Sequence, residues 1–455
     1  MGSLYSHARN VYICMGDDTN CHAIDVKSLI SDALSLSTNG SFQTVSSHNP
    51  LRNDPRWFSL GPLTENPWFQ RTWVVQEAAL AQNPRVLYGK EEFSYRDLIR
   101  VLSWLNSSTW AIRYGLSSLF IHLQWPDWRL PPPHPEYTFL ELLSHASLLK
   151  CSDPRDKIYA FLGHSLAQTP SSGLIVKPDY KKHPKEVYLE LSKTLIQTHG
   201  LRTLTMVEHT PETILDDLPS WVIQWDVSLV LNDIYRVPNF SFLASAGLSS
   251  RSSTIIDANS LIVRGVILDR VKRSFRIDAT EAVGITFEDT LTSERMSLNR
   301  ALRSLCTDKI LSPYVDVQDA FCQTLCIGNS VLDKRLFSPA VKLATYFEKL
   351  SSNTKNVPEP PEDSMTYWSE IQAFCTNRSF VVTEQGFYCL GPLLTIPGDI
   401  PCVLFGVDVP FILRPAMGSQ QFRLLGESYV HGVMLGQVHG MVQREELFEQ
   451  TITIH

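Results

Sequence analysis

The sequence predicts a mixed α+β protein, and three patterns along the chain support this. Apolar residues recur at helical spacing in residues 17–36 and again through residues 138–226. Short apolar runs separated by Gly and Pro turns fill residues 378–440, as in a small β-sandwich or barrel. Helix and strand patterns are mixed before residue 82. The expected segments are an α/β part in 1–82, a mainly helical middle in 83–250, and a mixed part in 251–455 that is β-rich from about 378.

The first part begins with a helix and a strand in residues 1–16, and a second helix follows in residues 17–36. Its apolar positions are Ala23, Val26, Leu29, Ile30 and Ala33. Residues 37–64 are rich in Ser, Asn and Pro, which predicts a loop.

A third helix is predicted from about residue 67 to residue 81. Asn66 is a good N-cap, and Pro67 suits the first helical position. Phe69 and Trp73 then share one face of the helix. We therefore expect Trp73 to be buried on the core side.

Further along, Asp153 and Pro154 predict the N-cap and first position of another helix, and Gly163 suits its C-cap. A longer helix is expected in residues 184–198, and alternating apolar residues in 254–272 predict a pair of strands.

Composition excludes several classes of function. The net charge of the 455-residue chain is −7 and its basic residues are scattered, which gives no support for nucleic-acid binding. No apolar run approaches 18 residues, so no transmembrane helix is expected. Nine cysteines without a regular framework suit reduced thiols. We expect a cytoplasmic protein that contacts neither membrane nor nucleic acid.

Glu77 is the main candidate for catalysis. A carboxylate beside Trp68 and Trp73 could act as a general acid or base. The preferred alternative is a structural pair of Gln76 and Glu77 that hydrogen-bonds the preceding loop. The nucleophile elbow, the P-loop and the dinucleotide fingerprint are all absent from the sequence, so no cofactor is expected.

Two cysteines also raise the question of a metal. Cys322 and Cys326 lie four residues apart in a region of helical pattern, but two thiols do not complete a tetrahedral zinc site. No pair of histidines lies nearby in the sequence. Core packing is favoured, and we expect no metal.

Two polar clusters remain. Asp153, Arg155 and Asp156 could form a charge network, and the preferred alternative is a capped, ion-paired helix start. Near the C-terminus, alternation would place the side chains at 427, 429 and 431 on one face of a strand. We expect this face to pack against the preceding helices, and the alternative is that these residues line a ligand site. The three residues are Glu427, Tyr429 and His431.

Five blocks of the sequence resemble segments of one known family, in the family's order. The decapeptide at residues 68–77, termed the signature segment, holds Trp68, Arg71, Trp73, Gln76 and Glu77. It resembles a segment of the fungal heterokaryon incompatibility (HET) domain. The other blocks are 153–163, 177–180, 219–226 with Trp221, and 426–432. We assign structural roles within these blocks to Trp68, Arg71, Trp73, Gln76, Asp153, Arg155, Asp156, Trp221, Glu427, Tyr429 and His431.

The resemblance also implies a partial domain. The strand-rich segments that open a HET domain have no counterpart, and residues 1–8 resemble an internal helix of that domain. We therefore expect an N-terminally truncated relative that keeps a remnant of an α/β domain similar to TIR domains.

What the resemblance implies about function is fungal non-self recognition and programmed cell death through a protein partner, without catalysis in this form. Two enzymatic alternatives stay open. One is a TIR-like NAD hydrolase that uses Glu77, and the other is an accessory enzyme of secondary metabolism. A chain without present activity is a third possibility.

Overall fold

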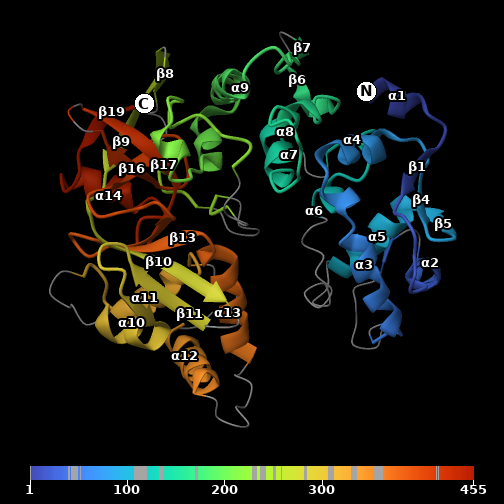
Figure 1. Ribbon diagram of the computed structural model, residues 1–455. Coiled ribbons are helices and arrows are strands. Elements are labelled where there is room, and N and C mark those ends of the chain that lie inside the picture. The colour runs from blue at the N-terminus through green and yellow to red at the C-terminus, as the bar shows by residue number, and fades with distance from the viewer. Residues whose placement is uncertain are drawn as a thin grey trace. The chain divides into compact units, whose positions relative to one another are not determined.

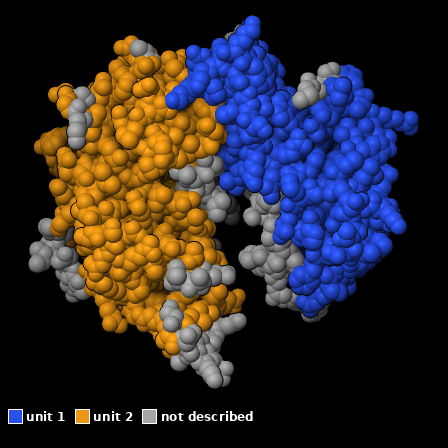
Figure 2. Space-filling view, in the orientation of Figure 1, with its two compact units in different colours: residues 1–187 blue, residues 188–455 orange. Residues whose placement is uncertain are grey.

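The computed structural model of the chain has two compact units, residues 1–187 and 188–455 (Figure 2). Helices and strands are mixed in both units, which confirms the predicted α+β class (Figure 1). The segment boundaries expected after residues 82 and 250 stay predictions. The structure describes residues 2–38, 41–42, 50–51, 53–106, 120–132, 137–169, 173–227, 233–235, 242–248, 253–257, 259–280, 284–305, 312–328, 336–352, 362–416, 418 and 420–455.

A small sheet forms the centre of the first unit. β1 (Val11–Cys14) runs parallel to β4 (Pro84–Tyr88), which pairs antiparallel with β5 (Glu91–Ser94). α2 (His22–Ser35) contacts β5 and α5 (Tyr95–Asn106), and its five predicted apolar positions are all buried. The unit's other elements are α1 (Gly2–His7), β2 (Ser37–Thr38), β3 (Ser41–Phe42), η1 (Pro55–Ser59), α3 (Leu60–Thr64), η2 (Pro67–Gln70), α4 (Thr72–Leu80), α6 (Phe120–Gln124), α7 (Phe139–His145), α8 (Asp156–Tyr159), η5 (Ser165–Ala167), β6 (Gln168–Thr169) and β7 (Gly173–Leu174).

The helix predicted from residue 67 to residue 81 is two elements, η2 and α4. Asn66 caps η2 as predicted, and its side chain accepts a hydrogen bond from the Trp68 N–H. Arg71 then has extended backbone angles, φ −88° and ψ 137°, so η2 and α4 do not share one helical screw. Phe69 is fully buried, whereas Trp73 is only half-buried. The prediction that Trp73 lies with Phe69 on the core side is therefore wrong.

The helix predicted to begin at Asp153 is also shorter than expected. α8 begins at Asp156 with Arg155 as its N-cap, and it ends at Tyr159 with Ala160 as its C-cap. Gly163 lies beyond that end and does not cap it. The next predicted helix is confirmed as α9 (Pro184–His199).

A closed five-stranded barrel dominates the second unit. Its order is β15 (Ile400–Leu404), β16 (Phe411–Pro415), β17 (Gln421–Glu427), β19 (Glu449–Ile454) and β9 (Ser260–Ile267), with β9 returning to β15. β8 (Thr254–Asp257) forms a hairpin with β9, which confirms the predicted strand pair. A Cβ on Gly265 of β9 would lie 2.7 Å from the Val403 carbonyl oxygen, so glycine permits the closing pair to approach.

The second unit also contains a six-stranded sheet covered by helices. Its order is β12 (Arg295–Ser297), β11 (Gly284–Asp289), β10 (Val271–Thr280), β13 (Arg378–Thr383), β14 (Tyr388–Pro392) and β18 (Tyr429–Val430). The helices that contact it are α10 (Leu298–Ser304), α11 (Val317–Leu325), α12 (Phe337–Ser351) and α13 (Glu362–Cys375) (Figure 1). A buried cluster joins Val266 and Val403 of the barrel to Val381 and Val430 of this sheet. The remaining elements are η6 (Gly200–Met206), η7 (Thr213–Leu215) and α14 (Gln437–Gln443).

None of the described helices is long and apolar enough to cross a membrane. Even α9, with 16 residues, carries charged residues along its length.

The break at Arg71 predicts unequal costs for two aromatic truncations. Phe69→Ala should destabilise the first unit by about 3–5 kcal/mol, because it opens a cavity at a fully buried site. Trp73→Ala should cost less than about 2 kcal/mol, because its ring already meets solvent. Urea unfolding followed by circular dichroism measures both. Equal shifts of the unfolding midpoint for the two variants would show that Trp73 is a core residue.

Candidate functional site

The signature segment is joined to Lys150 by main-chain hydrogen bonds. The Lys150 N–H donates to the Gln70 carbonyl at 2.6 Å, and the Thr72 N–H donates to the Lys150 carbonyl at 2.9 Å. Arg71 and Lys150 thus form an isolated parallel β-bridge. The Thr72 hydroxyl also donates to the Lys150 carbonyl, and the Lys150 ammonium donates to Gln70 Oε1. Two blocks about 80 residues apart therefore build one local structure.

Gln76 packs inside this structure. Its side chain is 4% exposed, and its Oε1 has no hydrogen-bond partner among the described residues. A Cβ on Gly163 would overlap the Gln76 amide nitrogen, and a Cβ on Gly2 would lie 3.0 Å from it. Gly163 is thus required for space. Gln76 fills the gap between α1 and the segment that follows α8.

Glu77 is half-buried and contacts α1. The Tyr5 hydroxyl donates to its carboxylate. Burial raises the pKa of Tyr5, the bond to Glu77 raises it further, and Arg71 opposes the rise. The Tyr5 phenol therefore lies near both a carboxylate and a guanidinium, and Tyr5 stays protonated at neutral pH.

Trp68 belongs to an aromatic cluster around His122. Its ring stacks on the imidazole with centroids 5.7 Å apart. His122 Nδ1 lies 2.8 Å from the Tyr95 hydroxyl oxygen, and Nε2 lies 3.0 Å from the Phe69 carbonyl oxygen. These contacts suit a neutral ring that accepts at Nδ1 and donates from Nε2. Burial lowers the pKa of His122 to about 4.

Asp153 and Arg155 form a hydrogen-bonded ion pair. The Arg155 N–H and Nε donate to Asp153 Oδ1 at 3.0 and 2.8 Å, and Nη2 donates to Oδ2 at 2.6 Å. These hydrogen bonds hold the pKa of Asp153 below its usual value. Arg155 Nη1 donates to the carbonyls of Tyr180 and Lys182. The Tyr180 hydroxyl donates to Asp156 at 2.6 Å. The loop that holds Tyr180 therefore contacts both Arg155 and Asp156, and Arg155 in turn binds Asp153.

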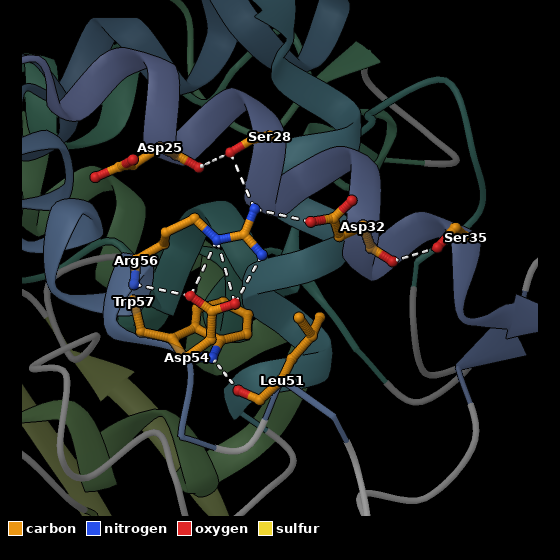
Figure 3. A network of polar contacts seen from close by, with 8 residues as sticks. All are labelled: Asp25, Ser28, Asp32, Ser35, Leu51, Asp54, Arg56 and Trp57. Carbon is orange, nitrogen blue, oxygen red and sulfur yellow. Dashed lines mark hydrogen bonds and ion pairs between the residues drawn. The ribbon is translucent and has the colours of Figure 1, made fainter.

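A second Asp-x-Arg pair repeats this geometry, and sequence reasoning missed it. The Arg56 N–H and Nε donate to Asp54 Oδ1 at 2.9 and 3.0 Å, and Nη2 donates to Oδ2 at 2.7 Å (Figure 3). Arg56 then reaches α2, where Nη1 lies 3.1 Å from the Ser28 hydroxyl and 2.8 Å from the Asp32 carboxylate. This network fixes the chain before η1 against α2.

A third pair, Asp127 and Arg129, makes the same three contacts. Asp127 also pairs with Arg96 of α5 at 3.2 Å. The spacing Asp-x-Arg is the signal that would have located all three pairs in the sequence.

A pocket of about 310 Å³ lies where the signature segment meets the Lys150 segment. It is lined by Arg71, Thr72, Trp73, Lys150, Cys151, Ser152 and Asp156. Glu77 is not among these residues, although Arg71 of the lining also lies near Tyr5, which donates a hydrogen bond to Glu77.

Trp221 anchors the barrel of the second unit. It is fully buried, and its Nε1–H donates to the Asn259 carbonyl at 3.0 Å, in the turn between β8 and β9. The neighbouring Ser220 hydroxyl accepts from the Leu424 N–H of β17 at 2.9 Å. These contacts give the 219–226 block a structural role.

Glu427, Tyr429 and His431 do not share one strand. β17 ends at Glu427 in the barrel, and β18 begins at Tyr429 in the other sheet, because the chain changes sheets at Ser428. The Tyr429 hydroxyl lies 2.9 Å from His431 Nδ1, so only these two side chains meet. The expectation of a single shared face is therefore wrong.

Glu427 instead forms a buried ion pair. Its carboxylate is 3.0 Å from Arg378 Nη2 and accepts from the N–H groups of Ile234 and Tyr235. Burial raises the pKa of Glu427, and Arg378 opposes the rise. The adjacent cavity, about 30 Å³, has room only for water. The geometry favours a structural pair over a ligand site.

Cys322 and Cys326 are fully buried at α11. In the described part of the chain, no three His, Cys, Asp or Glu side chains are placed to hold a metal ion.

The fit of Gln76 against Gly163 predicts a matched pair of glycine effects. Gly163→Ala should destabilise the first unit by about 1–3 kcal/mol, because its Cβ overlaps the amide. Gly61→Ala, whose Cβ meets nothing within 4 Å, should be neutral or stabilising. Gln76→Ala should remove much of the Gly163→Ala penalty in the double variant. Additive costs in thermal unfolding would contradict this packing.

The buried His122 predicts acid sensitivity. The folded state keeps His122 neutral, while the unfolded chain binds a proton as pH falls through 6.5. Its contribution is present above pH 6.5 and is lost toward pH 4, a difference of about 3 kcal/mol. His122→Gln should flatten the pH dependence of the melting temperature, and exposed His7→Gln should not. Parallel curves for wild type and His122→Gln would refute this assignment.

Comparisons with known proteins agree with the resemblance of the sequence blocks. Residues 1–77 match the family described as "Heterokaryon incompatibility protein (HET)", and residues 361–449 match the "Het-6 beta-barrel domain". The chain is 22% identical over 468 residues to "Heterokaryon incompatibility protein 6, OR allele" of Neurospora crassa, covering 84% of this chain and 66% of that protein. No solved structure matches.

The regions matched by the two families include the signature segment and strands of the barrel. The HET match ends at Glu77, the last residue of the signature segment, and the barrel match includes β15, β16 and β17. The two matches and the relative together support the resemblance of the chain to heterokaryon incompatibility (HET) domain proteins.

Proposed function

We propose that the chain acts in fungal non-self recognition, where it binds a protein partner in the cytoplasm and contributes to programmed cell death. The family matches at both ends and the Neurospora crassa relative support this role. The alignment spans 66% of that relative, so its activity enters only as part of the proposal.

One observation supports a non-catalytic mechanism. The polar residues of the signature segment make contacts with other parts of the first unit. Arg71 lies in a main-chain bridge with Lys150, and Gln76 is packed against Gly163. Glu77 receives the hydroxyl of Tyr5. We infer that these residues fix the shape of a recognition module and do not act on a substrate.

The first alternative is a TIR-like NAD hydrolase. A specific observation favours it, because Glu77 accepts a hydrogen bond from the Tyr5 hydroxyl, and Arg71 lies close enough to Tyr5 to lower the pKa of that hydroxyl. The other alternative, an accessory enzyme of secondary metabolism, has no comparable geometric support among the described residues.

The proposal is tested by the ability of strains to fuse. Two auxotrophic fungal strains are forced to form heterokaryons, and one strain expresses the chain. Expression should lower the frequency of prototrophic heterokaryons at least tenfold with some partner strains and leave it unchanged with others. Glu77→Gln should behave as wild type, whereas Gly163→Val should lose the effect because it disrupts the packing of Gln76.

Two outcomes would overturn the non-catalytic mechanism. The first is loss of the effect in Glu77→Gln when this variant melts at the wild-type temperature. The second is consumption of NAD by the purified chain that Glu77→Gln abolishes. Unchanged fusion with every partner strain would overturn the recognition role itself.

A further inference from the structure

The 310 Å³ pocket in the first unit is a feature that the proposed function does not use. Its volume is at the lower end of the range for small-molecule sites. Two different segments build its wall, because the bridge between Arg71 and Lys150 brings them together. Its position is therefore fixed by main-chain hydrogen bonds.

The charge of the lining favours an anion. Arg71 and Lys150 are both exposed at the pocket, and no ion pair is formed by either side chain within the described residues. Lys157 lies close enough to lower the pKa of the Cys151 thiol against the dominant effect of burial. Asp156 is the one carboxylate in the lining, and it already accepts the Tyr180 hydroxyl. Arg and Lys together bind phosphate or carboxylate groups.

The half-buried Trp73 supplies an apolar wall. The break at Arg71 turns this ring away from the core, where Phe69 lies, and into the lining of the pocket. An indole face in contact with solvent is a stacking surface for a flat ring. The Asp156 carboxylate can accept a hydrogen bond from a ring N–H.

We propose that this pocket binds a small aromatic anion, a flat ring that carries a phosphate or carboxylate group. Arg71 and Lys150 bind the anionic group, the Trp73 ring stacks on the flat ring, and Asp156 accepts a hydrogen bond from it. The site stands independently of the role in non-self recognition, because purified protein is sufficient to test it.

Cys151 provides the measurement, because its thiol lines the pocket. The purified chain is alkylated with N-ethylmaleimide, and mass spectrometry follows each cysteine. Cys14 and Cys21 are exposed outside the pocket and serve as internal references. The probes are AMP and indole-3-acetate, with adenosine as a ring without the anion and inorganic phosphate as an anion without the ring.

We expect AMP, indole-3-acetate or both to slow alkylation of Cys151 at least fivefold without affecting Cys14 or Cys21. Comparing the two probes distinguishes phosphate from carboxylate. Adenosine and inorganic phosphate should protect at least tenfold less well at equal concentration. Arg71→Gln and Lys150→Gln should each weaken protection at least fivefold, whereas Lys90→Gln, which removes an exposed charge outside the pocket, should not.

Three results would overturn the proposal: no protection by any probe, protection by inorganic phosphate equal to that by AMP and indole-3-acetate, or protection that survives both Arg71→Gln and Lys150→Gln. If Cys151 is alkylated too slowly to follow, calorimetric titration with the same probes and variants gives the same decision. Trp73→Ala distinguishes the contribution of stacking from that of charge. It should weaken the binding of AMP and indole-3-acetate and leave any binding of inorganic phosphate unchanged.

Discussion

A short main-chain bridge determines the structure of the candidate site in the first unit. Lys150 accepts from and donates to the residues on either side of Arg71, and this pairing holds Arg71 in an extended conformation. Extended backbone at one position ends η2 and begins α4 with a new orientation. Trp73 then faces the pocket and Gln76 faces Gly163. Without the bridge, residues 67–81 would be free to form one continuous helix, and the pocket would lose one wall.

The Asp-x-Arg pairs act in a related way, by holding irregular chain in place. In each pair the carboxylate accepts two bonds from the guanidinium and one from the arginine N–H, so a turn is closed locally. All three pairs then reach a distant element, because Arg56 reaches α2, Arg155 reaches the Tyr180 loop and Asp127 pairs with Arg96 of α5. Charge-assisted bonds of this kind are stronger than neutral ones, although solvent exposure limits their net value. Their main effect is to define loop geometry that apolar packing alone leaves open.

The sequence predicted the structure well where the pattern is local. The buried positions of α2 follow helical spacing, and the cap at Asn66 follows from the residue type. Prediction from the sequence failed where the local structure depends on a residue far along the chain, because no local pattern shows that Lys150 pairs with Arg71. The same reason separates Glu427 from Tyr429, since the change of sheet at Ser428 depends on strands that lie elsewhere in the sequence. The Asp54 network could have been found, because its spacing repeats that of Asp153 and Arg155.

The barrel shows that a family match and a structural unit have different limits. The match to the Het-6 barrel covers residues 361–449, yet β9 lies at 260–267. β9 pairs with both β15 and β19, so the barrel has no closed form without it. Closure matters physically because an open barrel would expose two strand edges to other chains. Gly265 permits β9 to approach β15, and Trp221 bonds the turn that leads into β9. The physical domain therefore includes β9 and the 219–226 block, which lie before the matched residues.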